Sequence, residues 1–290
     1  MKSPHFTKTR IAPTPSGFLH LGNVLSFVIT AAIAQKTQAK ILLRIDDLDR
    51  TRAKKPYVQD IFDTLNFLEI PYDEGPQNYR EYETQYSQLH RMGLYQKALE
   101  QLKDTGSAFA CTCSRTQVHA GRPDICRDKF LPFNTADASW KIKTDRGQDI
   151  PVNTLRHGIT KVKLPGEMQD FVMRKKDGYP AYQLASVIDD LHFGVDLVIR
   201  GEDLWPSTLA QLYLASVLAY QDFQYIAFHH HLLLTEANGK KLSKSAGDTS
   251  VMSLRKQGKK SPDIYAAIAA MLGLKENPSD RQQLAALLEI

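Results

Sequence analysis

RIAPTPSGFLHLGN, from Arg10 to Asn23, is the stretch that decides the fold of this chain. Arg10 and Ile11 end a short segment typical of a strand, and the prolines and Gly17 that follow predict a tight turn. From Leu21 onward apolar residues recur at helical spacing, which predicts a helix. Because the start of a helix presents free N–H groups and a positive dipole end, we expect an anion, most simply phosphate, to bind beside His20. The alternative is an ordinary strand–helix turn with an incidental histidine.

A second short motif, Lys241-Leu242-Ser243-Lys244-Ser245, lies far along the chain. Together with His20-Leu21-Gly22-Asn23 it resembles the HIGH and KMSKS signatures of class I aminoacyl-tRNA synthetases, in the form used by the glutamyl branch. The chain has neither a Walker-type phosphate loop nor a G-x-G-x-x-G fingerprint, so the common NTPase and dehydrogenase interpretations lack their defining residues. The resemblance implies an α/β fold with a Rossmann-like (HUP-type) parallel sheet, an inserted smaller α/β module and a short helical C-terminal region.

Changes of pattern along the chain predict how this fold is divided. Residues 1–106 and 171–236 would be the two halves of a Rossmann catalytic domain, residues 107–170 an inserted module, and residues 237–290 the KMSKS-like loop with a helical C-terminal region. One expected helix, from about Glu83 to Asp104, would bury Tyr86 and Leu89 among its core residues. We see no internal repeats and no low-complexity linker.

Composition and charge narrow the class of protein and partner. Apolar residues make up 42% of the 290 residues and charged residues 24%, which is ordinary for a soluble globular protein. The net charge of +5 and the pI near 8.9 favour a polyanionic partner, and seven of the basic residues lie between positions 240 and 260 beside a single acid, Asp248. No run of about eighteen apolar residues and no leader pattern occurs, so we expect a cytoplasmic protein.

The resemblance also assigns candidate residues for two substrates. For ATP they are His20 and Gly22 of the first signature and Lys241, Ser243 and Lys244 of the second, with His20 and Lys244 as the catalytic donors to phosphate. For glutamate they are Arg10, Ala12, Ser16, Asp46, Tyr182 and Arg200. The alternative for Arg200 is a surface side chain paired with Glu202.

Carboxylates gather after the strand expected at residues 39–45, in Asp46-Asp47-Leu48-Asp49. Such a position, at the carboxyl end of a strand, is where ligands bind in open α/β sheets. By resemblance Asp46 would meet the α-amino group of glutamate, although the family usually has Glu there and Asp is one methylene shorter. The alternative, an acidic cap for the next helix, fits Asp47 or Asp49.

The three cysteines, Cys111, Cys113 and Cys126, could hold zinc. A structural zinc site needs four ligands, and the small synthetases that the chain resembles use a tyrosine four residues before the last cysteine as the fourth. Arg122 stands at that position here, so His119 or Asp124 would have to replace the tyrosine. The other interpretation is a decayed site with reduced, partly buried thiols.

The run His229-His230-His231 also suggests a metal, but neighbouring residues on a strand point to opposite faces, so the three cannot converge on one ion. We expect these histidines to precede a strand over Leu232 to Leu234.

The function implied by the resemblance is activation of glutamate by ATP and Mg²⁺, with release of pyrophosphate and formation of glutamyl-adenylate, followed by transfer to RNA. A chain of 290 residues has an expected radius of gyration near 19 Å, too small to charge a tRNA acceptor end and check its anticodon together. The resemblance is therefore closest to the glutamyl-queuosine tRNA(Asp) synthetase family, which modifies the queuosine base at the wobble position, and we expect a monomer. The alternatives are a truncated glutamyl-tRNA synthetase that charges the 3′ end of tRNA(Glu), and a catalytically silent RNA-binding relative.

Overall fold

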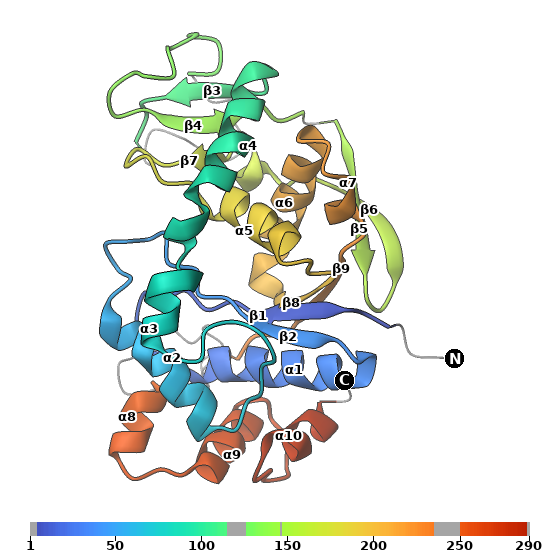
Figure 1. Cartoon of the computed structure of the whole chain (residues 1–290). Helices are drawn as coiled ribbons and strands as arrows, with labels where there is room; N and C mark the ends of the chain where they lie inside the picture. Colours follow the sequence, from blue (N-terminus) through green and yellow to red (C-terminus); the bar gives the residue numbers. More distant parts are fainter. Residues whose placement is uncertain (1–4, 115–125, 146, 235–249, 289–290) are drawn as a thin grey trace. The chain divides into compact units, whose positions relative to one another are not determined.

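The computed structural model of the chain describes residues 5–114, 126–145, 147–234 and 250–288 (Figure 1). The chain divides into two compact units. Unit 1 contains Met1–His90, Leu197–Glu202 and His230–Ile290, and unit 2 contains Arg91–Asp196 and Asp203–His229. The module expected at residues 107–170 falls within unit 2.

Unit 1 begins with a strand–helix–strand motif whose two strands are parallel. β1 (Lys8–Ile11) pairs with β2 (Lys40–Leu43) so that Arg10 lies opposite Leu42 and Ile11 opposite Leu43. α1 (Leu21–Thr37) connects them, as the stretch around His20 predicts. β8 (Leu197–Gly201) also lies against β1 and α1.

α1 is apolar on nearly all sides because it lies inside unit 1. Its buried residues include Val24, Leu25 and Val28, none more than 2% exposed. The helix ends at Gln38, whose φ of 58° is left-handed and turns the chain into β2. α9 (Ser261–Met271) and α10 (Arg281–Leu287) pack against α1 (Figure 1), and the short α8 (Val251–Lys256) packs against α2 (Lys55–Phe67). These contacts confirm the expected helical C-terminal region.

Unit 2 combines two sheets with helices. β3 (Ala108–Cys111), β4 (Ser139–Ile142) and β7 (Val172–Arg174) form an antiparallel sheet. β5 (Asp149–Thr154) pairs antiparallel with β6 (Gly158–Lys163) and parallel to β9 (Ala227–His231), with Thr154 opposite Phe228; Ala227–His229 of β9 belong to unit 2. The helices are α4 (Met92–Asp104), α5 (Tyr182–His192), α6 (Trp205–Val217) and α7 (Gln221–Gln224).

A buried ion pair joins two of these helices. Arg91, at the start of α4, donates from Nε and Nη2 to both carboxylate oxygens of Asp189 on α5, at 2.7 and 3.0 Å. The hydroxyl of Tyr95 donates to the same carboxylate at 2.6 Å. This network fixes α4 against α5 in the core of unit 2.

Two predicted elements are wrong in detail. The helix expected from Glu83 to Asp104 is broken into a π-helical turn at Tyr82–Tyr86, a 3₁₀ turn at Gln88–Arg91 and α4, because Ser87 leaves the helical backbone at a ψ of 141°. Leu89, expected in the core, is consequently 37% exposed. The three histidines do not precede a strand but form the end of β9 itself.

No helix within the described parts of the chain combines the length and the apolar character that crossing a membrane requires.

Candidate functional site

His20 closes the amino end of α1 and is itself held in one orientation. The N–H of Gly22 donates to Nδ1 of His20 at 3.1 Å, and the N–H of His20 donates to Oδ1 of Asn23 at 3.0 Å. A backbone N–H can only donate, so Nδ1 must be unprotonated and the neutral ring carries its proton on Nε2. The ring therefore presents an N–H donor at Nε2, where the resemblance expects a phosphate oxygen.

Gly22 is needed because the imidazole of His20 lies directly over it. A Cβ added at Gly22 would lie 3.1 Å from both Cε1 and Nδ1 of His20, closer than ordinary van der Waals contact. Any side chain at this position would push the ring away or break its hydrogen bond. This is a structural reason for the glycine of the first signature, independent of any ligand.

Residues from both ends of unit 1 support the loop that carries His20. The N–H of Leu19 donates to Oδ2 of Asp60 on α2 at 2.8 Å, and the C=O of Leu19 accepts from the N–H of Val251 at 2.8 Å. Ser250 forms an antiparallel backbone bridge with His20 and caps α8 through its hydroxyl. Lys241, Ser243 and Lys244 lie outside the described residues, but the described chain that follows them resumes at Ser250, in contact with His20.

The two arginines predicted to choose glutamate are both buried in unit 1, on neighbouring strands. Arg10 and Arg200 are each 4% exposed, and Nη1 of Arg10 donates to the C=O of Ile199 at 3.2 Å. That bond places the Arg10 side chain against the strand that carries Arg200. The alternative of a surface side chain at Arg200 is wrong, because the residue is buried.

Asp46 lies beside the same loop, since its N–H donates to the C=O of Pro13 at 3.0 Å. Its carboxylate is gripped by Arg44, whose Nε and Nη2 donate to the two carboxylate oxygens at 2.7 and 3.1 Å. Both residues are buried. An α-amino group at Asp46 would thus share a carboxylate that is already paired with and oriented by Arg44.

Asp47 has a structural role instead. Its fully buried carboxylate accepts from the hydroxyls of Tyr82 and Ser87, both at 2.6 Å, from the N–H of Gln88 at 2.9 Å and from Arg50 at 2.5 Å. Burial, together with the charge of Asp47, raises the pKa of Tyr82, so its hydroxyl stays a donor at neutral pH. The predicted helix cap is wrong for both Asp47 and Asp49, because α2 has Lys54 at its N-cap without a side-chain hydrogen bond.

The remaining glutamate candidates lie in both units. Ala12 and Ser16 are half-buried along the loop between β1 and His20 in unit 1. Tyr182 is the first residue of α5 in unit 2 and is 39% exposed. Their roles stay predictions.

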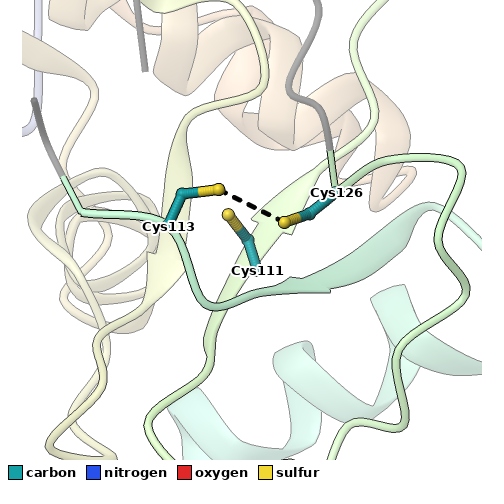
Figure 2. Close-up of side chains that lie close together, drawn as sticks. All are labelled: Cys111, Cys113 and Cys126. Atoms are coloured by element: carbon teal, nitrogen blue, oxygen red, sulfur yellow. Dashed lines mark hydrogen bonds between the residues drawn. The ribbon is translucent and has the colours of Figure 1, made fainter. Parts of the chain in front are cut away.

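The three cysteines form a cluster in unit 2 (Figure 2). Their sulfur atoms all lie within 4.8 Å of one another, and the Sγ atoms of Cys113 and Cys126 are 3.3 Å apart. Cys111 and Cys126 are buried against Phe109. Since a zinc–sulfur bond is about 2.3 Å long, tetrahedral thiolate ligands lie roughly 3.8 Å apart, so the residues fit three corners of a zinc site. His119, Arg122 and Asp124 lie outside the described residues.

Sequence reasoning missed three residues that build this site, namely Arg44, Asp60 and Ser250. Asp60 falls on a helix whose exposed face also carries acids, and nothing in the spacing marks it as buried. Arg44 had a signal, a cation within an otherwise apolar strand end, two residues before Asp46.

Residues 7–285 match the family described as tRNA synthetases class I (E and Q), catalytic domain. The chain is 33% identical to "Glutamate--tRNA ligase" of Dehalococcoides mccartyi over 92% of this chain and 56% of that protein. It is 35% identical to "Glutamyl-Q tRNA(Asp) synthetase" of Parasynechococcus marenigrum over 91% of this chain and 82% of that protein. The chain thus spans about half the length of the glutamate–tRNA ligases and most of the length of the glutamyl-Q protein.

Among solved structures, the glutamate–tRNA synthetase of Elizabethkingia anophelis is similar over 97% of this chain and 65% of its own, with a TM-score of 0.73 at 24% identity. This likeness confirms the predicted α/β, Rossmann-like fold.

Proposed function

Because this chain belongs to the family of class I tRNA synthetases (E and Q), we propose that it activates glutamate with ATP and transfers it to the queuosine base at the wobble position of tRNA(Asp). The observation that carries the catalytic part is the His20 ring, whose Nδ1 accepts from the N–H of Gly22, so that the ring carries its own N–H at Nε2. The observation that carries the RNA part is the match over 82% of a relative named glutamyl-Q tRNA(Asp) synthetase.

In the activation step, a carboxylate oxygen of glutamate attacks the α-phosphorus of ATP while the bond to pyrophosphate breaks. Negative charge grows on the phosphate oxygens, and a fixed N–H donor stabilises that charge without having to reorient. His20 Nε2 is such a donor, and Lys244 and Lys241 would supply positive charge from the second signature. Magnesium bound to the triphosphate would neutralise further charge.

Selection of glutamate over glutamine follows from Arg10 and Arg200. A guanidinium group pairs with a carboxylate through two parallel N–H donors, but an amide offers its own N–H₂ group at one of those positions. Since both arginines are buried, a bound glutamine would leave donors unpaired in the protein interior. Such a mismatch can discriminate by about 10⁴ to 10⁵, which makes a proofreading domain unnecessary.

At the other end of the amino acid, Asp46 would accept from the α-amino group. Asp46 is shorter than the usual Glu, and Arg44 donates to both of its carboxylate oxygens. We propose that Arg44 fixes the position of the shorter side chain, so that the substrate or a bridging water reaches it.

The acceptor RNA is tested by locating the glutamate on the product. Labelled glutamate and ATP are incubated with the protein and, in parallel, with tRNA(Asp) containing queuosine or with tRNA(Glu), and nuclease digestion separates the anticodon fragment from the terminal adenosine. Label in the anticodon fragment, lost when the same tRNA carries unmodified guanosine, is the expected result. Label on the 3′ adenosine of tRNA(Glu) would instead establish the truncated glutamyl-tRNA synthetase, as the match to the glutamate–tRNA ligases allows.

For the cysteine cluster we propose a zinc ion held by Cys111, Cys113 and Cys126. The convergence of the three sulfur atoms supports it. His119 or Asp124 would complete the four ligands, since the cationic Arg122 cannot coordinate a metal.

A further inference from the structure

Leu19, the residue before His20, has both of its backbone groups bound by distant elements. Its N–H donates to the carboxylate of Asp60 on α2, and its C=O accepts from the N–H of Val251, where α8 begins, each at 2.8 Å. Leu19 is itself 3% exposed. Its N–H is therefore out of reach of bulk water and depends on Asp60 for a partner.

Asp60 occupies an unfavourable place for a carboxylate. It is 4% exposed, and burial raises the pKa of its carboxyl group, opposed by the hydrogen bond from Leu19. Asp63 raises the pKa further and Arg255 lowers it. A buried carboxylate costs folding free energy unless its hydrogen bonds compensate. If α2 only had to pack against its neighbours, an apolar side chain at this position would cost less folding free energy.

We propose that Asp60 is a positioning residue for His20 in the adenylate-forming step. Its carboxylate fixes the peptide that leads into His20, and so it sets the place of the imidazole that Gly22 orients. The inference rests on the proposed activation of glutamate, but not on which RNA accepts the product.

A catalytic donor tolerates only a small displacement from its productive position. The ring is oriented locally by the hydrogen bond from Gly22, and the His20 backbone N–H is bound by Asn23, whereas the position of the preceding peptide depends on what holds Leu19. Catalytic donors must lie within about 0.5 Å of their productive position, and an error of about 1 Å can cost 10²-fold in rate. Removing the acceptor on α2 leaves the N–H of Leu19 without this partner, while Val251 and Ser250 still hold the turn from α8, so the turn can shift and ATP can still bind.

The test compares Asp60→Leu, Asp60→Asn and the matched control Asp63→Leu in glutamate-dependent exchange of pyrophosphate with ATP, with tRNA present. Leu resembles Asp in shape, favours the helix and removes the acceptor, whereas Asn keeps an oxygen that accepts from Leu19. Asp63 lies three residues further on α2, where it accepts from Gln59 at 2.9 Å at the exposed surface. We expect Asp60→Leu to lower kcat about tenfold or more with the KM for glutamate little changed, Asp60→Asn to restore most of kcat, and Asp63→Leu to resemble the wild type.

Three outcomes would overturn the inference. The first is an Asp60→Leu variant as active as the wild type, and the second is equal loss of kcat in Asp60→Leu and Asp60→Asn. The third is failure of Asp60→Leu and of Asp60→Ala to fold while Asp60→Asn folds, which would make the role one of stability alone. A wild-type protein that forms no glutamyl-adenylate with any tRNA would instead refute the proposed function.

Discussion

The neutral His20 ring can donate only from Nε2, because the N–H of Gly22 occupies Nδ1. Two substitutions separate this donor from the helix cap that the same ring provides. Asn is a good N-cap residue, so His20→Asn keeps the cap and loses the donor, whereas His20→Ala loses both. We expect both variants to lower kcat for pyrophosphate exchange by about 10²- to 10³-fold. Only His20→Ala should also lose stability, by about 1 kcal/mol in urea unfolding. Near wild-type exchange in His20→Asn would refute the phosphate role, and His157→Ala, at an exposed site, is the control.

Substitution of Arg200 tests how the protein selects glutamate over glutamine. Arg200→Lys keeps the positive charge but replaces a planar two-donor fork with a single ammonium group. We expect kcat/KM for glutamate to fall roughly tenfold or more, and the preference for glutamate over glutamine to shrink with it. Pyrophosphate exchange with each amino acid measures both quantities. Arg156→Lys, an exposed conservative change, should alter neither, and an unchanged preference in Arg200→Lys would contradict the bidentate argument.

At the scale of elements, burial of the Asp60 carboxylate on α2 should lower the free energy of unfolding at neutral pH. The pKa of Asp60 is raised in the folded protein, so the folded state binds the proton more tightly than the unfolded state does. The free energy of unfolding must therefore decrease as the pH rises from the unfolded pKa, about 3.9, through the raised folded value, and stay reduced above it.

Asp60→Asn removes this titration. We expect urea unfolding near pH 7 to show the variant at least as stable as the wild type, with the difference moving in favour of the wild type as the pH falls towards 4. A difference that does not change with pH would contradict the burial argument. Asp63→Asn, in a more exposed position on the same helix, is the matched control.

If the cysteine cluster holds zinc, the metal should stabilise the neighbouring sheet of β3, β4 and β7. We expect purified protein to contain about one zinc per chain by elemental analysis, and Cys111→Ser to lose it. Because metal binding stabilises only the folded form, a strong chelator should lower the melting temperature of the wild type and leave that of Cys111→Ser unchanged. His119→Ala and Asp124→Ala then identify the fourth ligand, since only the true ligand weakens metal retention. If wild-type protein purified under reducing conditions contains no zinc, the proposed site is refuted.

At the scale of the whole molecule, the proposed reaction places the acceptor base in the anticodon loop. A short stem-loop with the anticodon sequence of tRNA(Asp) and queuosine at the wobble position contains that base, so we expect it to accept glutamate. An acceptor-stem helix from tRNA(Glu) should accept none. Transfer of labelled glutamate to each RNA measures the contrast. The reverse pattern would favour the truncated glutamyl-tRNA synthetase and would leave the activation chemistry of His20 and Arg200 unaffected.

Local rules of the sequence determined a good part of this protein. A turn-rich loop with His20 before an apolar helical pattern predicted the strand, the turn and the start of α1, and the structure confirms all three. The resemblance of two short motifs predicted the family, which the match over residues 7–285 confirms. The strand and the helix depend on neighbours in the chain, so spacing reveals them, whereas the family follows from the resemblance of the two motifs to known signatures.

Tertiary structure alone decided how the loop is held. Asp60 reaches Leu19 from another helix, and Ser250 pairs with His20 from the far end of the chain. The same holds for the broken helix after Tyr82, where Asp47 attracts three groups into one buried cluster. Spacing could not predict these contacts. A hydrogen bond to a buried carboxylate depends on which surfaces the folded chain brings together, and a periodic sequence pattern does not indicate those surfaces.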